Sequence, residues 1–460
     1  MKKGLAAVIL AAGKGTRMKS ALPKVLHPIC GQSMLYYPLE AARAAGFKDL
    51  KVVIGHQADQ VTETFSANQD ITWVEQTDQL GTGHALLCAA ESLRGYSGPL
   101  LLLCGDVPLL KVETLQQLQN YHTGQQAAVT VLTARMPNPG GYGRVIRDGE
   151  QILQIVEEKD ATDAQREVTE INTGTYIFDT AFVLNALRGL KKNNAQKEYY
   201  LTDVVASAVA EGRKTRALCV DDPTEVMGIN DRCQLAEAEV LMRWKINADL
   251  MLGGVSMVDP TTVYIDNGVE IGVDTTLHPN VQLRGKTSIG KNCIIESGTV
   301  IVDSRLADGV HIKAGSVIES STVGDLCEIG PMAHLRPGNV LHGKNKIGNF
   351  VEAKKSSFGE GTKASHLTYI GDTEVGRNVN FGCGTITCNY DGEKKHKTVI
   401  EDDVFIGSDT QFVAPVRIGR NSLIAAGSTI TKDVPPDALA LSRVEQKIVE
   451  GWRLRKKKKT

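Results

Sequence analysis

Aliphatic residues recur at every sixth position through much of the C-terminal half of this 460-residue chain. A period of six fits neither the 3.6-residue helix nor a long open strand, so each hexad is expected to be a short strand plus a corner. The pattern predicts a hexapeptide parallel β-helix with about three hexads per turn. Such a solenoid has strand edges only at its ends, and its flat faces suit assembly with copies of itself. The three unbroken series are Ile271, Leu277, Leu283, Ile289, Ile295, Ile301; Val323, Ile329, Leu335, Leu341, Ile347, Ala353; and Ile400, Ile406, Phe412, Ile418, Ile424, Ile430.

The N-terminal half instead alternates short apolar runs with helical stretches, which predicts an α/β domain with a mostly parallel sheet. Helical spacing without Gly or Pro continues over Asp231–Leu252 and ends at Gly253-Gly254, so we expect one connecting helix. The expected domains are therefore residues 1–230, a linker over 231–252, and residues 253–460. The apolar runs are Leu5–Leu10, Lys51–Ile54, Leu100–Cys104 and Ala127–Thr133, and the clearest helical stretches are Ser33–Ala45 and Val112–Tyr121.

Composition narrows the class of protein. The chain is 42% hydrophobic and 23% charged with a net charge of -1, which argues against a general nucleic-acid binder. The basic run Arg453–Lys459 is expected to be a solvated tail, with attraction of a polyanion as the alternative. Met1-Lys2-Lys3 leads into an apolar run too short to span a membrane and without a cleavage pattern, so a cytoplasmic protein is expected. Nine cysteines without paired metal-ligand spacing indicate free thiols.

Candidate chemistry begins where the first apolar run ends, in Leu10-Ala11-Ala12-Gly13-Lys14-Gly15-Thr16-Arg17. Gly13 and Gly15 allow a tight turn that exposes backbone N–H groups, and Lys14 and Arg17 add positive charge, as a triphosphate requires. The loop has neither the P-loop spacing nor the full dinucleotide fingerprint. By itself, therefore, it is also compatible with an ordinary strand-to-helix turn.

Three downstream features favour the hypothesis that this loop binds a nucleotide. Lys24 could neutralise a phosphate, and Gln76 with the glycine-rich Leu80–His84 could read a base edge. The run Leu100–Cys104 leads into Gly105 and Asp106, which places a hard oxygen ligand at the carboxyl end of a strand, where α/β sheets bind ligands. The alternative for Asp106 is a simple turn residue.

The hexad frame predicts a second site. Arg336 and Lys354 both follow an inward residue and are eighteen positions apart, so they should lie one above the other on adjacent coils, roughly 4.8 Å apart. Stacked cations favour an anion between them, with a solvated pair as the alternative. His366 lies two residues after inward Ala364 and should point outward. The segment from about Thr387 to Lys397 breaks the rhythm, and insertions in a solenoid commonly carry binding functions.

Eight motifs then carry a family resemblance: LAAGKGTRM, LPK, LGTGHA, GDVPL, GYGR, VEEKDA, EINTG and GIN, ending at Asn230. They resemble sugar-1-phosphate nucleotidyltransferases. Joined to the hexad repeat, nearly the whole chain resembles the bacterial bifunctional family of N-acetylglucosamine-1-phosphate uridyltransferases and glucosamine-1-phosphate N-acetyltransferases, enzymes of UDP-N-acetylglucosamine synthesis. The fold implied is a Rossmann-like α/β domain, a connecting helix and a left-handed parallel β-helix.

The resemblance implies roles in the N-terminal domain. Asp106 and Asn230 would share Mg²⁺, with UTP as the nucleotide substrate. A sugar phosphate is already ionised near neutral pH, so positioning and charge neutralisation suffice and no nucleophilic side chain is expected. The implied nucleotide and UDP-sugar ligands are Leu10, Ala11, Ala12, Gly13, Arg17, Lys24, Gln76, Gly81, Thr82, Gly105, Asp106, Gly143, Glu157, Asn172 and Asn230.

In the C-terminal domain, acyl transfer to an amine that is mostly protonated at pH 7 requires a base, and the resemblance assigns that role to His366. Cys383 stands where the family pattern has a small alanine, and we expect a buried, inert thiol there. The implied amino-sugar-phosphate ligands are Arg336, Lys354, Tyr369 and Asn380, and the implied acetyl-CoA ligands are Cys383, Asn389, Tyr390, Ser408, Ala426 and Arg443.

A flat prism face offers little enclosure, so the acetyl-transfer site is expected to need a neighbouring chain in a homotrimer, with small molecules rather than nucleic acid or membrane as other partners. Two alternatives remain at this stage. One is a single-activity nucleotidyltransferase whose non-catalytic β-helix is only a regulatory or oligomerisation module. The other is a non-catalytic assembly subunit.

Overall fold

The computed structural model describes residues 4–457, with side chains up to residue 455. Met1-Lys2-Lys3 and the end of the basic run, Lys458 and Lys459, lie outside the described residues. The chain forms two compact units, Met1–Met242 and Arg243–Thr460, and the division falls within helix α8 (Arg232–Leu252), the helix expected from the spacing. Among the described residues no helix is long and apolar enough to cross a membrane.

The N-terminal unit is built on a nine-stranded sheet with the order β11-β7-β10-β6-β1-β4-β5, and with β8 and β9 branching from β10. β1 pairs in parallel with β4 and β6, whereas β10 runs antiparallel to β6 and β7. The strands are β1 (Ala6–Leu10), β4 (Asp49–Ile54), β5 (Ile71–Glu75), β6 (Pro99–Cys104), β7 (Val129–Arg135), β8 (Arg144–Asp148), β9 (Gln151–Val156), β10 (Glu170–Asp179) and β11 (Thr215–Cys219), beside a small hairpin of β2 (Pro28–Ile29) and β3 (Gln32–Ser33). The four strands expected from the apolar runs are confirmed.

Helices cover both faces of this sheet, because alternate residues of its central strands are apolar on both sides. Val8 of β1 belongs to one buried cluster and Ile9 to the other. The first cluster takes in α3 (Thr82–Ala89), α6 (Thr180–Ala186) and α7 (Asp203–Ala210), and the second takes in α1 (Tyr36–Ala44), α2 (Ala58–Thr64) and α4 (Val112–Gln125). This is the three-layer arrangement of doubly wound sheets. Short elements complete the unit: α5 (Asp163–Arg166) and the 3-10 turns Thr16–Met18, Lys24–Leu26, Glu91–Leu93, Leu187–Gly189 and Pro223–Val226.

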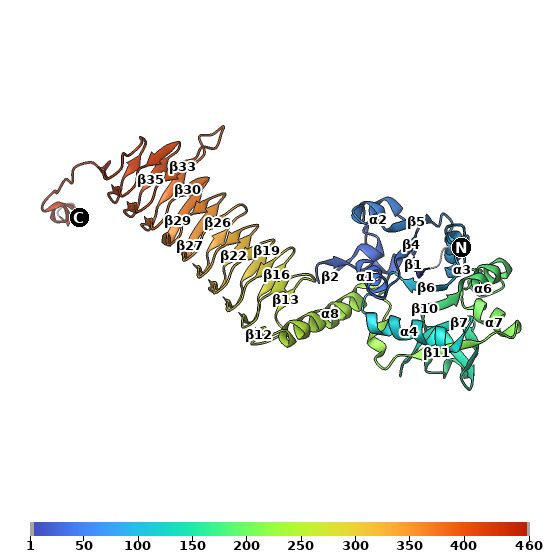
Figure 1. Cartoon of the computed structure of the whole chain (residues 1–460). Helices are drawn as coiled ribbons and strands as arrows, with labels where there is room; N and C mark the ends of the chain where they lie inside the picture. The colour runs from blue at the N-terminus through green and yellow to red at the C-terminus, as the bar shows by residue number, and fades with distance from the viewer. Residues whose placement is uncertain (1–3, 458–460) are drawn as a thin grey trace. The chain divides into compact units, whose positions relative to one another are not determined.

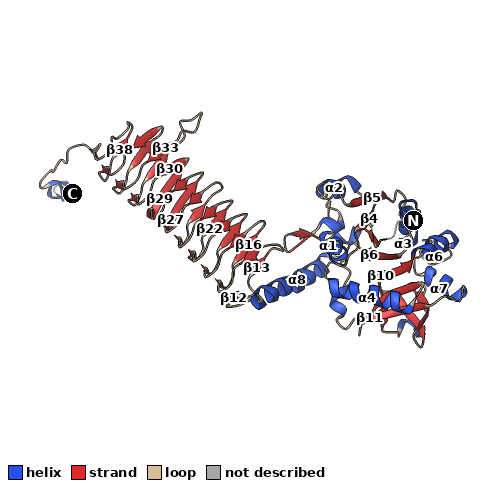
Figure 2. Ribbon diagram, viewed as in Figure 1, coloured by secondary structure: helices blue, strands red, loops and turns tan. Residues whose placement is uncertain are grey.

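The C-terminal unit consists almost entirely of short strands, drawn as successive rows in Figure 1 and in red in Figure 2. Strands one coil apart pair in parallel at a spacing of 17 or 18 residues over most of the length, as in Glu270↔Ser288 and Arg305↔Thr322. The coil of about three hexads is therefore confirmed. A short helix, α9 (Trp452–Lys457), lies near the chain end, and Arg453 and Arg455 of the basic run are exposed there.

The bounds of the solenoid strands follow the coils in order. They are β12 (Ser256–Met257), β13 (Tyr264–Ile265), β14 (Glu270–Ile271), β15 (Thr276–Leu277), β16 (Gln282–Arg284), β17 (Ser288–Ile289), β18 (Ile294–Ile295), β19 (Val300–Val302), β20 (Arg305–Leu306), β21 (His311–Ile312), β22 (Val317–Glu319), β23 (Thr322–Val323), β24 (Glu328–Ile329), β25 (His334–Leu335), β26 (Val340–Leu341), β27 (Lys346–Lys354), β28 (Ser357–Phe358), β29 (Lys363–Gly371), β30 (Thr373–Val375), β31 (Asn380–Phe381), β32 (Ile386–Cys388), β33 (Thr398–Ile400), β34 (Phe405–Ile406), β35 (Gln411–Val413), β36 (Val416–Ile418), β37 (Leu423–Ile424), β38 (Thr429–Ile430) and β39 (Leu439–Ala440).

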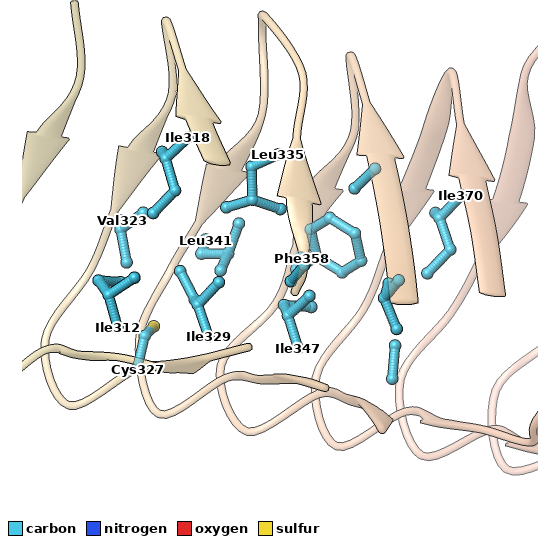
Figure 3. Close-up of a cluster of buried hydrophobic side chains, with 14 of the residues drawn as sticks. Ile312, Ile318, Val323, Cys327, Ile329, Leu335, Leu341, Ile347, Phe358 and Ile370 are labelled. Atoms are coloured by element: carbon cyan, nitrogen blue, oxygen red, sulfur yellow. The ribbon is translucent and has the colours of Figure 1, made fainter. Parts of the chain in front are cut away.

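The six-residue series points into the solenoid, as the pattern predicts. Ile329, Leu335, Leu341 and Ile347 are at most 1% exposed and meet across the interior, where Figure 3 draws them. Ile271 is the one member of the three series that is only partly buried, because it lies at the start of the stack and packs on one side only. Inward stacking of aliphatic side chains is the main source of stability in such a coil.

The predicted break in the rhythm is also present. β30 pairs with β33 at a spacing of 25 residues (Glu374↔Val399) instead of 17 or 18, so the intervening loop projects beyond the coil. Within it, Tyr390 bridges to Lys395 in antiparallel fashion, and Asp391 accepts hydrogen bonds from the backbone N–H groups of Glu393 and Lys394 at 2.8 and 2.7 Å. The loop is thus a small folded hairpin.

Candidate functional sites

The first site forms where β1 and β6 end side by side. Leu10 pairs with Cys104, and the N–H of Gly105 donates to the carbonyl of Leu10 at 2.9 Å, which brings the glycine-rich loop against Asp106. Gly15 has φ +58°, and a Cβ there would meet the Lys24 side chain, so the turn requires glycine. A cavity of about 470 Å³ opens at this point. It is lined by Leu10, Ala12, Gly13, Lys14, Gln76, Gln79, Gly81, Thr82, Ala85, Cys104, Asp106 and Glu198.

Two oxygen ligands converge beside this cavity. Lys24 Nζ is bound to Asp106 and donates to Asn230 Oδ1 at 3.0 Å, and Arg17 donates to the same Asn230 oxygen at 2.7 Å. One ammonium therefore reaches both residues expected to share a metal, although they are far apart in the chain. A carboxylate and an amide oxygen are hard ligands of the type that Mg²⁺ takes alongside phosphate and water, so the donor set fits that ion. Clusters of three or more His, Cys, Asp or Glu side chains placed to hold a metal are absent from the part of the chain described.

Three of the expected UDP-sugar ligands, Gly143, Glu157 and Asn172, also lie together. A Cβ on Gly143 would come within 3.5 Å of Glu157 Oε2 and 3.6 Å of Asn172 Cβ, and the N–H of Asn172 donates to the carbonyl of Gly143 at 2.8 Å. Burial raises the pKa of the Glu157 carboxyl, while a hydrogen bond from the Thr202 hydroxyl at 3.2 Å opposes that rise. Thr202 was not among the expected site residues, because it belongs to no motif and reaches Glu157 only through the fold.

In the solenoid, Arg336 and Lys354 stand in register as predicted. Leu335 pairs with Ala353 on the adjacent coil, so Arg336 and Lys354, which come directly after them, also lie side by side. The N–H of Arg336 donates to the carbonyl of Ala353 at 2.9 Å. The Arg336 guanidinium is bound to Glu352 at 2.8 Å, which raises its pKa.

Lys395 is a third cation of this cluster. It lowers the pKa of Lys354 most, and Arg336 lowers it further. Both effects show that cations crowd around Lys354 where an anion would relieve the repulsion. Lys395 was missed because it lies in the inserted loop, where the hexad count gives no position.

Tyr369 borders this cluster. It pairs with Glu352 on the preceding coil, and Asn389 Nδ2 lies 3.5 Å from its hydroxyl. Asn389 is also hydrogen-bonded to Asp372 and is 7% exposed, whereas Tyr390 is 59% exposed and donates to the carbonyl of Gly392. Asn389 is therefore buried beside the cation cluster, whereas Tyr390 is exposed on the loop that carries Lys395.

His366 is exposed, as the frame predicts, and opens onto a groove of about 520 Å³. The groove is lined by Ser365, His366, Asn380, Phe381, Gly382, Cys383, Phe405, Ile406, Gly407, Ser408, Leu423, Ile424, Ala425 and Ala426. Arg336, Lys354 and Tyr369 are not among the described residues that line this groove. Each lies beside the next inward position of its own coil, at Leu335, Ala353 and Ile370, beyond the corner that spans residues 365–367 in the coil of His366. Arg336 and Lys354 belong to the two coils that precede the groove-lining residues. The cation cluster and the His366 groove thus lie on successive faces of the prism.

One expectation was wrong. Cys383 is exposed and lines the groove, rather than being a buried thiol. The reason is the frame itself, since Cys383 follows inward Phe381 by two residues, just as His366 follows Ala364, and that position faces outward. Arg443 lies farther along, where a Cβ on Gly427 would be 3.6 Å from its Cδ, next to Ala426.

The relatives found by comparison cover nearly the whole chain. Residues 6–226 match the family model described as nucleotidyl transferase, residues 260–358 match the GMPPB C-terminal domain, and residues 397–432 match six repeats of the bacterial transferase hexapeptide. The chain is 61% identical over 451 residues to the bifunctional protein GlmU of Syntrophotalea carbinolica, covering 98% of this chain and 97% of that one. It is 57% identical over 454 residues to the protein of the same name from Geotalea uraniireducens (98% and 99% covered), and 48% identical over 444 residues to that of Shouchella clausii (96% and 97% covered).

Proposed function

This chain belongs to the family of bifunctional GlmU proteins, and we propose that it acetylates glucosamine-1-phosphate in its C-terminal unit and transfers UMP from UTP to the product in its N-terminal unit. The products are UDP-N-acetylglucosamine and pyrophosphate. The observation that carries the proposal is the coexistence of two separately built sites, the phosphate cavity at Asp106 and the groove at His366. A β-helix with no catalytic role would leave the second site unexplained.

For uridylyl transfer, the sugar phosphate oxygen attacks the α-phosphorus of UTP, and pyrophosphate leaves. Gly143, Glu157 and Asn172 would hold the sugar, and the glycine-rich loop would hold the triphosphate. Lys24 and Arg17 stand where negative charge builds up, since both reach Asn230 beside Asp106. Asp106 and Asn230 would hold Mg²⁺, which when bound neutralises phosphate charge.

For acetyl transfer, the acceptor ammonium must first lose one proton to solvent, and His366 is the base that the groove offers for the second proton. The free amine attacks the thioester carbonyl, the new C–N bond forms as the nitrogen gives that second proton to His366, and the C–S bond breaks. The proton held by His366 then passes to the departing CoA thiolate. Arg336, Lys354 and Lys395 would hold the phosphate of the acceptor, and Ser408 and Ala426 line the groove that would hold acetyl-CoA.

A homotrimer would bring the two faces together. The cation cluster of one chain and the His366 groove of its neighbour could then border one pocket, which a single prism does not form. Support comes from Met332, Phe350 and Leu367, which follow one another on adjacent coils with 58%, 56% and 59% exposure and positive φ angles of 52°, 58° and 32°. Bulky apolar residues are disfavoured at positive φ, and their exposure to water is also unfavourable. Burial of these side chains against a second copy of the chain would offset both the backbone strain and the exposure.

Nine free cysteines fit a reducing compartment, so we place the enzyme in the cytoplasm, where UTP and acetyl-CoA are available. The proposal is tested with His366→Ala in two assays. Release of CoA thiol from acetyl-CoA and glucosamine-1-phosphate should fall roughly 10²–10⁴-fold, the usual contribution of a general base. Pyrophosphate release from UTP and N-acetylglucosamine-1-phosphate should not change. Unchanged thiol release would remove His366 from the mechanism.

A further inference from the structure

His366 has one described hydrogen-bonding partner for its imidazole, the side chain of Asn349. The two residues pair across adjacent coils, Asn349 on β27 and His366 on β29, and His366 Nδ1 lies 3.2 Å from Asn349 Oδ1. This contact joins Nδ1 to an amide, whereas Nε2 has no hydrogen-bonding partner among the described residues, and His366 lines the groove. The Asn349 side chain is half-buried, so the coil holds it more firmly than a fully exposed residue.

The backbone fixes both side chains in the same direction. Each residue stands immediately before a corner in the left-handed region, at Phe350 (φ +58°) and Leu367 (φ +32°). The Thr368 hydroxyl also donates to the carbonyl of His366 at 2.6 Å, which restrains the corner that follows the histidine. The two adjacent coils therefore turn at the same position. The β-ladder between β27 and β29 keeps Asn349 and His366 in register, in addition to their side-chain contact.

We propose that Asn349 is a positioning residue for acetyl transfer: its Oδ1 accepts a hydrogen bond from Nδ1–H of His366, so that Nε2 carries the lone pair that removes the proton from the amine. The inference rests on the proposed function, in which His366 is the base. Neutral imidazole carries one N–H, and the partner of one nitrogen decides which nitrogen is basic.

The proton balance supports this arrangement. Once the acceptor ammonium has lost one proton to solvent, the attacking amine gives a second proton to Nε2 as the C–N bond forms, and the resulting imidazolium keeps its Nδ1–H bond to Asn349. When Nε2 passes that proton to the CoA thiolate, the ring returns to the starting tautomer without a flip. An amide serves this role without adding charge, whereas a carboxylate would stabilise the imidazolium and make the ring a stronger base but a poorer acid toward the thiolate.

The surroundings of the ring bear on any pH measurement. Cys383 is the titratable residue, besides His366, among those that line the groove, and Lys363 is exposed at the start of the same strand. On the preceding coil, Lys346 begins the strand that carries Asn349. A double variant with Cys383→Ala therefore separates titration of the thiol from that of the imidazole.

The first test uses Asn349→Ala in the full-length enzyme. We expect kcat for acetyl transfer to fall roughly tenfold to a hundredfold, part of the 10²–10⁴ range of a general base, while KM for both substrates stays within about twofold. Gln282→Ala is the matched control, because Gln282 is a partly exposed amide residue in the first coils of the same solenoid. Thermal unfolding and uridylyl transfer, measured on each variant, report loss of fold.

The second test is Asn349→Asp. A carboxylate within hydrogen-bonding distance should raise the pKa of His366, so the acidic limb of the kcat/KM profile should move up by roughly one pH unit. In the wild-type enzyme, ¹⁵N spectra with labelled histidine should show an N–H at Nδ1 and a bare Nε2 at alkaline pH.

These outcomes separate the two proposals. If His366→Ala keeps acetyl transfer, the proposed function fails first. If His366→Ala is inactive but Asn349→Ala keeps its kcat and its pH profile, the role of Asn349 alone is overturned. An N–H found at Nε2 in the free enzyme would overturn it as well, since the amide would then be donating to Nδ1.

Discussion

The two sites are assembled in opposite ways. The N-terminal site gathers residues from distant parts of one chain, because parallel strands deliver their carboxyl ends to one edge of the sheet, and Lys24 can touch both Asp106 and Asn230. The solenoid repeats one coil, so its functional residues form columns along a face and do not converge. His366 and Arg336 therefore lie on successive faces. A doubly wound sheet can therefore complete a site within one chain, whereas the solenoid spreads its candidate residues over more than one face.

Asp106→Ala should separate the two regions most sharply. Removing the carboxylate takes away an oxygen ligand and leaves Lys24 with only Asn230, so uridylyl transfer should fall roughly 10²–10³-fold or more. Acetyl transfer should be unaffected, because the solenoid has its own core. Pyrophosphate release and CoA thiol release, followed on the same preparation, check both halves. Asp59→Ala, on the exposed side of α2 in the same unit, is the control, and retained uridylyl transfer in Asp106→Ala would exclude Asp106 from the site.

Met332→Asp tests whether the prism needs a second copy. The substitution puts a charge among the exposed apolar side chains of Met332, Phe350 and Leu367. The proposed trimer should then dissociate and most acetyl transfer should be lost, while uridylyl transfer continues. Leu326→Asp is a matched control, with the same 58% exposure and a similar φ of +56° on a different corner. Sedimentation equilibrium reports the assembly state. A monomeric Met332→Asp protein with full acetyl transfer would show that a single prism suffices for the reaction.

Arg336→Ala should act on binding rather than on the chemical step. Loss of one charge-assisted hydrogen bond to phosphate corresponds to about 1.5–3 kcal/mol, so KM for glucosamine-1-phosphate should rise roughly 10–100-fold with little change in kcat. The KM for acetyl-CoA should not change, since Arg336 is outside the His366 groove. Arg284→Ala serves as the control, because that arginine is exposed on the first coils. An equal rise in both KM values would point to a distorted coil instead.

Glu157→Gln should weaken sugar binding yet stabilise the N-terminal unit. Burial raises the folded-state pKa of this carboxyl above its unfolded value. The folded state therefore binds the proton more tightly, and stability is lost as pH rises from the unfolded pKa through the folded one. A neutral amide avoids that loss and can still accept from Thr202, so the melting temperature should exceed that of the wild type above this range and match it below. A melting temperature lowered at pH 8 would contradict the assignment.

In the solenoid, much of the candidate site can be predicted from the sequence, because counting by six gives the direction in which each side chain points. Arg336 over Lys354 and the outward His366 both follow from it. The six-residue count does not predict the place of Lys395, because this residue lies in an inserted loop where the period is interrupted. In the N-terminal unit, motifs locate Gly13 and Asp106, but Thr202 meets Glu157 only through tertiary packing, which no local pattern records.

Cys383→Ala is expected to have the smallest effect of these substitutions, and it tests the exposed thiol of the His366 groove. Cys383→Ala should change acetyl transfer by no more than about twofold, because the side chain is small and alanine fits the same corner. It should, however, protect the groove from iodoacetamide, since the wild-type thiol is exposed beside His366. Cys219→Ala, which removes an exposed thiol of the N-terminal unit, should give no protection. Equal inactivation of wild type and Cys383→Ala would show that the reagent acts elsewhere, and acetyl-CoA should slow the reaction only where Cys383 is present.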